Sequence, residues 1–181
     1  MAINLSSQVS APWLAEVQCR YLVRDDLPAL EWDGEYRHFR RLYADTYYQM
    51  EKGQALIWVA ELADFGLVGQ VFVSLSGARP ELSDGMTRAY IYGFRIRPVY
   101  RNQGIGAGLL HTVEEDLFQR KLRWSTLNVG RENHGALRFY LRLGYHIVAP
   151  EAGHWSYVND EGRRCDVCEP AWRMEKELLR P

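Results

Sequence analysis

The chain of 181 residues carries 22 basic and 23 acidic side chains, which gives a formal net charge of −1 at pH 7. This balance disfavours a nucleic-acid partner, because phosphate contacts need a surplus of Lys and Arg. No run approaches the roughly 20 apolar residues that cross a bilayer, and the first residues lack the pattern of a signal peptide. We therefore expect a cytoplasmic protein with no nucleic-acid or membrane partner. It should form a single domain over residues 16–181, after an N-terminal tail of residues 1–15.

The three cysteines are too few for a disulfide framework. Cys165 and Cys168 form a C-x-x-C pair with His154 upstream. Four-ligand zinc sites usually contain two such pairs, and the sequence has only one. We expect no metal, and we interpret the two cysteines as part of the approach to the last strand.

The N-terminal half predicts a strand, two helices and a hairpin. Polar and apolar residues alternate over 17–23, which is typical of a half-exposed strand. Asp25 and Pro28 suit the start of a short helix. Apolar residues recur at three- and four-residue spacing over 36–51, which predicts an amphipathic helix. Strand-like runs over 55–62 and 67–75 flank a turn.

The C-terminal half predicts a strand over 88–97, which Pro98 ends. A helix over 105–121, a strand over 124–129 and a second helix around 136–141 follow. The remainder predicts two strands, one over 145–148 that resumes near Trp155 and one over 171–178. This order indicates an α/β (mixed α+β) domain with a mixed sheet and helices on both faces.

A glycine-rich turn follows the strand that Pro98 ends and opens the next helix. Unpaired N–H groups in such a turn, with the positive end of a helix, make an anion site suited to a pyrophosphate. A P-loop would place Lys and Ser or Thr after Gly104, where the chain has Ile105 and Gly106. A dinucleotide-binding turn would place glycine at Leu109. The pattern R/Q-x-x-G-x-G/A remains, and Arg101, Gly104 and Gly106 satisfy it.

This pattern resembles the acetyl-CoA loop of the GCN5-related N-acetyltransferase (GNAT) superfamily. A second motif of that family, Asn-x-x-Ala-x-x-Phe-Tyr-x-x-x-Gly-Tyr, is matched by Asn133, Ala136, Phe139, Tyr140, Gly144 and Tyr145. The resemblance implies the GNAT acyl-CoA N-acyltransferase fold, with a central mixed seven-stranded sheet. It also implies acetyl-CoA as co-substrate, an amine as acceptor and, as is common in the family, a homodimer.

The resemblance further implies roles for single residues. The backbone of Phe94, Arg95 and Ile96 would pair with the pantetheine arm, and the Ile96 N–H would hold the developing oxyanion. The pyrophosphate would lie against Arg101, Asn102, Gln103, Gly104, Ile105, Gly106 and Ala107. Asn133 would bind the cofactor near the pantetheine, or cap its helix, or both. Tyr140 would protonate the leaving thiolate, although an aromatic residue at helical spacing is more often core.

The general base is missing from the central strands. Many relatives have a glutamate there, whereas this chain has Tyr90, Tyr92 and Asn128. Carboxylates cluster instead near Trp32 and Tyr36, in the loop that borders the acceptor in relatives: Glu31, Asp33 and Glu35. This loop would attract a cationic amine and pass its proton to solvent, with Asp33 as the first choice. The alternative is a solvated polar loop.

We therefore expect direct transfer of an acetyl group from acetyl-CoA to a primary amine, either of a small molecule or of a protein. A non-catalytic acyl-CoA-binding or regulatory module with the same fold is the alternative, because a fold does not specify an activity. A nucleotide-binding domain is a third option, which would bind NAD or ATP in place of CoA.

Overall fold

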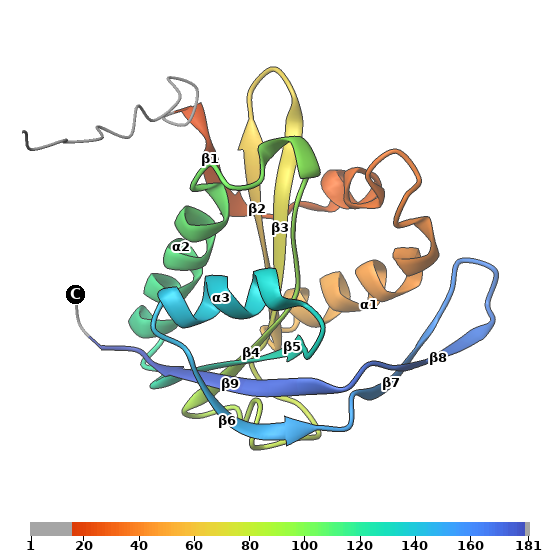
Figure 1. Cartoon of the computed structure of the whole chain (residues 1–181). Helices are drawn as coiled ribbons and strands as arrows, with labels where there is room; N and C mark the ends of the chain where they lie inside the picture. Colours follow the sequence, from red (N-terminus) through yellow and green to blue (C-terminus); the bar gives the residue numbers. More distant parts are fainter. Residues whose placement is uncertain (1–15, 180–181) are drawn as a thin grey trace, which may run out of the picture.

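The computed structural model describes residues 16–179, so the tail expected over 1–15 lies outside the described residues. A mixed sheet of seven strands in the order β1-β2-β3-β4-β5-β9-β6 forms the centre of this part of the chain (Figure 1). Only β4 and β5 are parallel; the other neighbours pair antiparallel. The strands are β1 (Gln18–Tyr21), β2 (Ala55–Leu62), β3 (Gly66–Ser74), β4 (Arg88–Ile96), β5 (Trp124–Gly130), β6 (His146–Glu151) and β9 (Ala171–Glu177).

Helices cover both faces of the sheet, as the sequence predicts. α2 (Ile105–Gln119) and α3 (His134–Arg142) pack on one face, and α1 (Arg40–Glu51) packs on the other (Figure 1). Each face of the sheet has its own hydrophobic core, and side chains of β2 contribute to both. Leu56 and Trp58 belong to the first core, on the side of α2 and α3, whereas Ile57 and Val59 belong to the second, on the side of α1. Successive side chains of a strand point to opposite faces, so a strand buried on both sides supplies both cores.

The two helices predicted between β1 and β2 differ from those observed. The first is a 3-10 helix, η2 (Arg24–Glu31), with Pro28 inside it. Trp32 and Asp33 then adopt left-handed backbone angles, with φ of 45° and 60°. A short 3-10 turn, η3 (Arg37–Phe39), comes next, and α1 begins only at Arg40. The amphipathic spacing therefore located the helix but placed its start too early, because 3-10 and α turns both bring residues three apart onto one side.

The C-terminal region contains two strands that the sequence did not predict as a pair. β7 (His154–Val158) and β8 (Arg164–Cys168) form a separate two-stranded sheet. Asn159 shapes the turn between them, because its Oδ1 accepts hydrogen bonds from the N–H groups of Glu161 and Arg163. Cys165 and Cys168 thus lie in β8 itself rather than in an approach to the last strand.

The described residues contain no cluster of three His, Cys, Asp or Glu side chains that could hold a metal ion. Among the same residues, no helix combines the length and the apolar character needed to cross a membrane.

Candidate active site

The central strands β4 and β5 separate halfway along their length. They pair from Arg88–Trp124 to Ile91–Leu127, yet β4 continues to Ile96 and β5 to Gly130. The pairing of β4 with β3 is irregular at the same level, between Gln70 and Phe72. An extra residue of this kind bends a strand locally. The result is a gap in the middle of the sheet, where backbone groups can pair with an extended ligand.

Gly93 makes this bend possible. Its φ of +58° lies in the left-handed region, and a Cβ there would lie 2.8 Å from the ring of Phe72. Both the backbone angle and the close ring therefore require glycine.

The N–H group of Ile96 faces the gap. The Arg97 N–H donates to the Val68 carbonyl at 2.8 Å, and Ile96 lies opposite Gly69. Antiparallel strands alternate hydrogen-bonded and non-hydrogen-bonded pairs, so Ile96 belongs to a pair that exchanges no hydrogen bond with β3. Its N–H therefore points toward β5, which is the direction that an oxyanion donor requires.

The glycine-rich turn lies directly after this strand. A short 3-10 helix, η4 (Pro98–Tyr100), leads into the turn, and Gly104 has a φ of +94°. The hydrogen-bond ladder of α2 begins with the Gly108 N–H donating to the Gly104 carbonyl at 2.9 Å. The N–H groups before Gly108 belong to the first turn, which has no intrahelical acceptors, so they are available to an anion.

Two side chains fix the shape of this turn. The Arg101 Nε donates to the Ile96 carbonyl at 2.9 Å, and the Gln103 amide donates to the Val99 carbonyl at 2.9 Å. The first bond ties the turn to the end of β4. The glycine-rich turn therefore lies directly beside the end of the gap.

Gly106 brings three elements together. A Cβ at this position would lie 3.5 Å from Ile96 and 3.6 Å from both Phe94 and Phe139. These side chains come from β4 and α3, and Gly106 belongs to the first turn of α2. The described structure therefore brings the two sequence motifs side by side.

Tyr140 lies on the buried face of α3 and is 8% exposed. Its ring contacts those of Phe94 on β4 and Tyr145, and it belongs to the hydrophobic core. Burial raises the pKa of its hydroxyl well above the ordinary value, and Tyr90 adds a smaller contribution in the same direction. The hydroxyl therefore keeps its proton over the physiological range.

Asn133 caps α3. Its Oδ1 accepts a hydrogen bond from the Ala136 N–H at 3.0 Å, and the residue itself is exposed. The capping role is present, and the side-chain NH₂ group is not needed for it.

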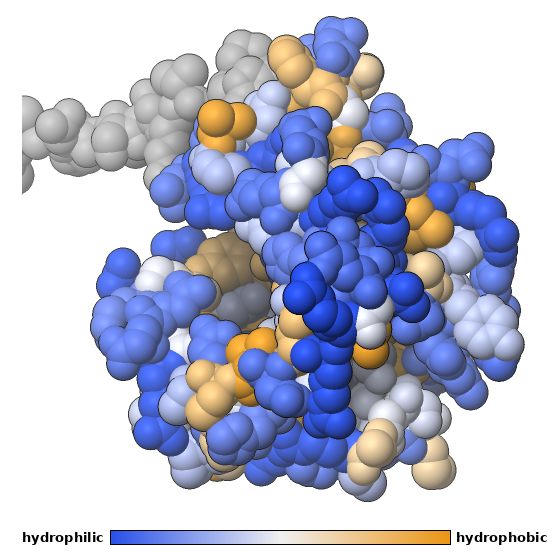
Figure 2. Space-filling model, turned by 90° about the vertical axis from the view of Figure 1, so that its right-hand side faces the viewer, coloured by the Kyte–Doolittle hydropathy of each residue, from blue (hydrophilic) through white to orange (hydrophobic). Residues whose placement is uncertain are grey.

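A cavity of about 620 Å³ opens on the α1 side of the gap. Figure 2 views the molecule from the side of α1 and the β7–β8 hairpin; this face is hollowed, with hydrophobic side chains among hydrophilic ones. The aromatic residues that line the cavity come from α1 and its N-terminus, β3, β4 and β7: Phe39, Tyr43, Phe72, Tyr90, Tyr92 and Trp155. A concave apolar site with a few polar groups is typical of small-molecule binding.

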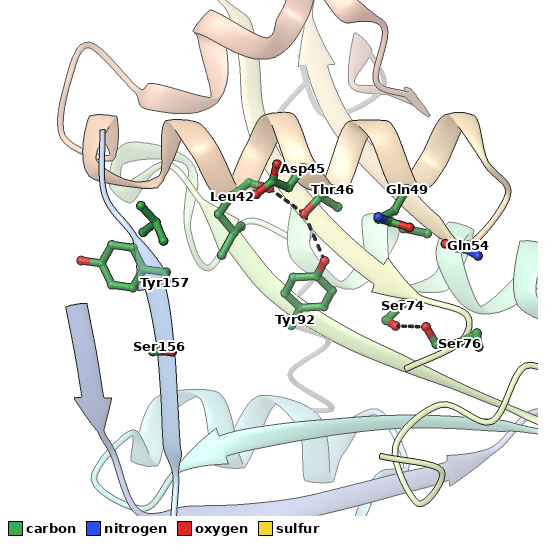
Figure 3. Close-up of a pocket in the computed structure, with 12 residues that line it drawn as sticks. Leu42, Asp45, Thr46, Gln49, Gln54, Ser74, Ser76, Tyr92, Ser156 and Tyr157 are labelled. Carbon is green, nitrogen blue, oxygen red and sulfur yellow. Dashed lines mark hydrogen bonds between the residues drawn. The ribbon is translucent and has the colours of Figure 1, made fainter. Parts of the chain in front are cut away.

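A second pocket of about 410 Å³ adjoins this cavity, and the two share Leu42 and Tyr92 (Figure 3). Its lining is more polar. The Thr46 hydroxyl donates to the Leu42 carbonyl at 2.8 Å and lies 3.3 Å from the Tyr92 hydroxyl. Tyr92 is thus held in place between the two pockets.

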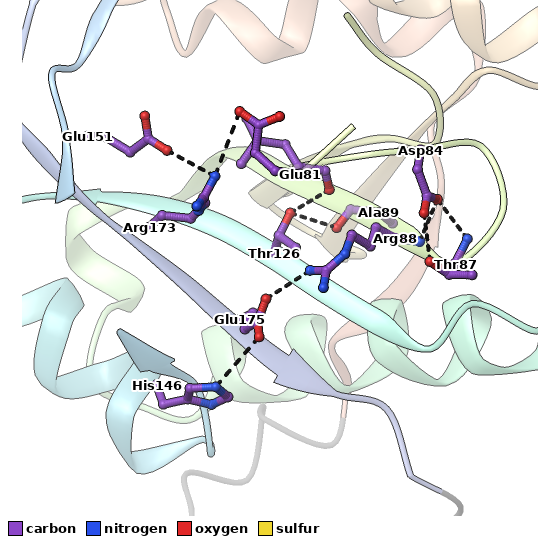
Figure 4. Close-up of polar contacts among 11 residues, drawn as sticks. Glu81, Asp84, Thr87, Arg88, Ala89, Thr126, His146, Glu151, Arg173 and Glu175 are labelled. Carbon is purple, nitrogen blue, oxygen red and sulfur yellow. Dashed lines mark hydrogen bonds and ion pairs between the residues drawn. The ribbon is translucent and has the colours of Figure 1, made fainter. Parts of the chain in front are cut away.

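Two carboxylates that sequence reasoning missed line the larger cavity, Glu151 and Glu169. Glu151 is paired with Arg79 at 2.7 Å. It also lies 3.5 Å from Arg173 (Figure 4). Glu169 is exposed and lies beside Gly130, where β5 ends. Neither residue belongs to a motif; the pairing of β9 with β5 and β6 brings them to the cavity.

The acidic loop does not reach the cavity. The Asp33 side chain is 88% exposed and pairs with Arg97 at 3.0 Å. Glu31 is held by two hydrogen bonds from Arg40, which lower the pKa of its carboxyl. Neither carboxylate lines the cavity. The proton-transfer role of Asp33 stays a prediction.

Comparison with known proteins identifies the class to which this fold and site belong. The model of the Acetyltransferase (GNAT) family matches residues 20–145, and the chain belongs to that family. A search of curated proteins gives no match.

Several solved structures share the fold. Ard1 from Thermoplasma volcanium superposes with a TM-score of 0.68 at 18% identity, over 91% of this chain and 99% of its own. The ribosomal-protein-S18-alanine N-acetyltransferase from Escherichia coli has a TM-score of 0.65 at 17% identity, over 91% and 96% of the two chains. A spermidine N-acetyltransferase SpeG chimera from Vibrio cholerae and hSSAT has a TM-score of 0.68 at 19% identity, over 90% and 96%. The seven-stranded mixed fold is therefore shared with acetyltransferases named for different acceptors.

Proposed function

We propose that this chain is an N-acetyltransferase that transfers the acetyl group of acetyl-CoA to a primary amine by direct attack. One observation carries the proposal: the gap between β4 and β5 lies between the glycine-rich turn that follows β4 and the cavity, whose lining includes Gly93 of β4 and Gly130 of β5. The turn would bind the pyrophosphate through residues Arg101 to Ala107. The thioester would then reach the gap while the amine enters from the cavity.

The residues around the gap suit each stage of this transfer. The amine nitrogen bonds to the acetyl carbonyl carbon, and the Ile96 N–H stabilises the oxygen that becomes negative. The carbon–sulfur bond then breaks, and the thiolate takes the proton of the buried Tyr140 hydroxyl. Asn133 would contact the cofactor with its free NH₂ group. The backbone of Phe94 and Arg95 would pair with the pantetheine arm.

The amine must lose a proton before it attacks, because an alkylamine with a pKa near ~10.4 is mostly protonated at pH 7. We propose, as the sequence indicates, that Asp33 accepts this proton through water from its position outside the cavity. Glu169 is a second candidate, because it lines the cavity at the end of β5.

Release of free CoA thiol from acetyl-CoA, measured with a panel of amines, tests the proposal. Amine-dependent release is expected. A non-catalytic acyl-CoA-binding module would bind CoA and release no thiol with any amine. We also propose that residues 16–181 form a single N-acetyltransferase domain, so a chain that lacks residues 1–15 should retain the activity.

A further inference from the structure

Arg95 has an unusual place in the cavity. Its guanidinium carbon lies 4.2 Å from the ring centroid of Tyr36 and 5.0 Å from that of Phe39. Its Nη1 also donates to the Tyr43 hydroxyl at 3.3 Å. Three aromatic side chains thus hold the guanidinium in one position. Cation–π contacts of this kind stabilise the charge but use few of its N–H donors.

The charge of Arg95 is not neutralised within the cavity. The other arginine of the lining, Arg79, is paired with Glu151 at 2.7 Å. Within residues 16–179, no carboxylate lies within ion-pair distance of Arg95, although Glu169 lines the same cavity. A guanidinium stays protonated in proteins and presents a fork of donors that matches a carboxylate. The cavity therefore offers a fixed cation to its occupant.

We infer that the acceptor is an amine that also carries a carboxylate, namely an amino acid with an apolar or aromatic side chain, and that Arg95 binds its carboxylate. This inference rests on the proposed function and narrows its acceptor class. The aromatic lining suits the side chain, because such rings bury apolar groups well. The exposed Glu169 carboxylate complements the ammonium group before it loses its proton.

The same charge disfavours a polyamine. An acceptor with only positive charges would meet the Arg95 guanidinium, and like charges at close range repel strongly in a partly buried site. The rings of the acidic loop are also occupied, because Arg97 lies over Trp32 at 5.3 Å and Arg95 lies over Tyr36. The two rings that sequence reasoning assigned to a cationic acceptor, Trp32 and Tyr36, are therefore already in contact with arginines of this chain.

In the reaction, the amino nitrogen bonds to the acetyl carbon and the carbon–sulfur bond of acetyl-CoA breaks. The ammonium group loses one proton to a carboxylate or water before the attack, and the nitrogen loses a second proton as the amide forms. Tyr140 protonates the thiolate, and the second amine proton, passed directly or through water, restores the Tyr140 hydroxyl. The carboxylate of the acceptor takes no part and stays on Arg95. The products are an N-acetyl amino acid and free CoA.

Matched pairs of amines test the inference on the full chain. L-Phenylalanine is compared with phenethylamine, and L-leucine with 3-methylbutylamine; each pair differs only by the carboxylate. We expect kcat/KM to be about 10- to 100-fold higher for the amino acid of each pair. A ratio of this size is what a hydrogen bond to a charged group contributes. Spermidine should be the poorest acceptor. Calorimetry of the same compounds with the enzyme–CoA complex gives their affinities without relying on turnover.

Arg95→Gln should abolish this preference by raising KM for the amino acids alone, with KM for acetyl-CoA unchanged. Arg95→Lys should restore part of it, because the charge returns without the fork. Arg123→Gln is the matched control, since Arg123 is exposed and pairs with Glu177 at 2.8 Å, outside the cavity lining. It should behave as the wild type.

Two results would overturn the inference. One is that phenethylamine, 3-methylbutylamine or spermidine is bound and acetylated as well as the amino acids. The other is that Arg95→Gln leaves the preference intact. Failure of the proposed function looks different, because then no amine releases CoA thiol. Even in that case, equal affinity of each matched pair for the enzyme–CoA complex would refute the role of Arg95.

Discussion

Tyr140 lies in the core and also contacts Phe94 at the gap, so its position fits both of the roles that sequence spacing presents as alternatives. Tyr140→Phe removes only the hydroxyl. We expect kcat to fall by roughly 10²-fold, the low end for a general acid, because a thiol is a fair leaving group. The affinity for CoA should stay within a few-fold.

Tyr145→Phe is the matched control for Tyr140. This buried hydroxyl lies 2.7 Å from that of Ser125, so its loss should lower stability and leave kcat close to wild type. Steady-state thiol release and thermal melts of both variants separate the two effects. Unchanged turnover in Tyr140→Phe would remove its hydroxyl from the mechanism.

The proton acceptor can be assigned by comparing two amide variants. Asp33→Asn should raise the acceptor KM and shift the acidic limb of the pH–kcat/KM profile if Asp33 takes the proton. Glu169→Gln should do the same, by up to about 10²-fold in kcat/KM, if the cavity carboxylate takes it. KM for acetyl-CoA should not change in either case. If both variants keep the wild-type profile, neither carboxylate is the base and the proton leaves through water.

The residues of the gap and turn could be predicted because they sit in short local motifs whose backbone geometry only glycine permits. Arg95 and Glu169 show what such motifs leave out. Whether the charge of Arg95 is paired depends on which carboxylates the fold brings near it, and the position of Glu169 depends on how β9 folds back against β5. Both features depend on contacts between residues far apart in the sequence, so no local spacing of residues predicts them.

At the scale of elements, we expect the first turn of α2 to determine whether CoA binds. Gly106→Glu would place a side chain and a negative charge where the pyrophosphate is proposed to lie, while Gly108→Glu adds the same group to an open, exposed position. At 100 times its dissociation constant, CoA should stabilise the wild type by about 2.7 kcal/mol. Thermal melts should show this upshift in Gly108→Glu and lose it in Gly106→Glu. A full upshift in Gly106→Glu would mean that the anion site lies elsewhere.

The loop before β4 depends on Asp84. Burial by itself would raise the pKa of this carboxyl, but bonds from the Thr87 hydroxyl and from three backbone N–H groups outweigh it and hold the pKa well below its usual range (Figure 4). A lowered pKa stabilises the fold above the unfolded value of about 3.9, and this contribution is lost as the pH falls below it.

Asp84→Asn should therefore lower Tm by a few degrees at pH 7, as expected for about 1 kcal/mol of lost hydrogen bonding. The difference from wild type should shrink below about pH 4. Melts of Asp84→Asn and of Asp64→Asn, in the β2–β3 turn, measure this. A difference that stays constant with pH would show that the charge of Asp84 is unimportant.

Most elements could be predicted because each buries a periodic apolar face. The β7–β8 hairpin could not, because it forms its own sheet outside the core. Trp155 is 44% exposed and Val158 is 43% exposed, so no buried face imposes a clear alternation. The early start predicted for α1 has a related cause, since Phe39 packs on the second core from a 3-10 turn rather than from the α-helix.

For the whole molecule, occupation of the gap should protect backbone groups that are now unpaired between β4 and β5. Amide hydrogen exchange with and without CoA tests this. We expect slower exchange over residues 92–97 and 128–130 with CoA, and little change at the β2–β3 hairpin. Equal protection at both places would point to general stabilisation rather than to a ligand in the gap.

The divergence of β4 and β5 also affects how the fold comes apart. Four parallel residue pairs supply the backbone bonding between β1-β2-β3-β4 on one side and β5-β9-β6 on the other. The central ladder of each group is longer, with eight antiparallel pairs between β2 and β3 and seven between β5 and β9. The line between them should therefore be the first to open in partial unfolding, with two cooperative units on either side. A ligand that spans this line would couple the units, so the substrate itself would complete the cooperativity of the fold.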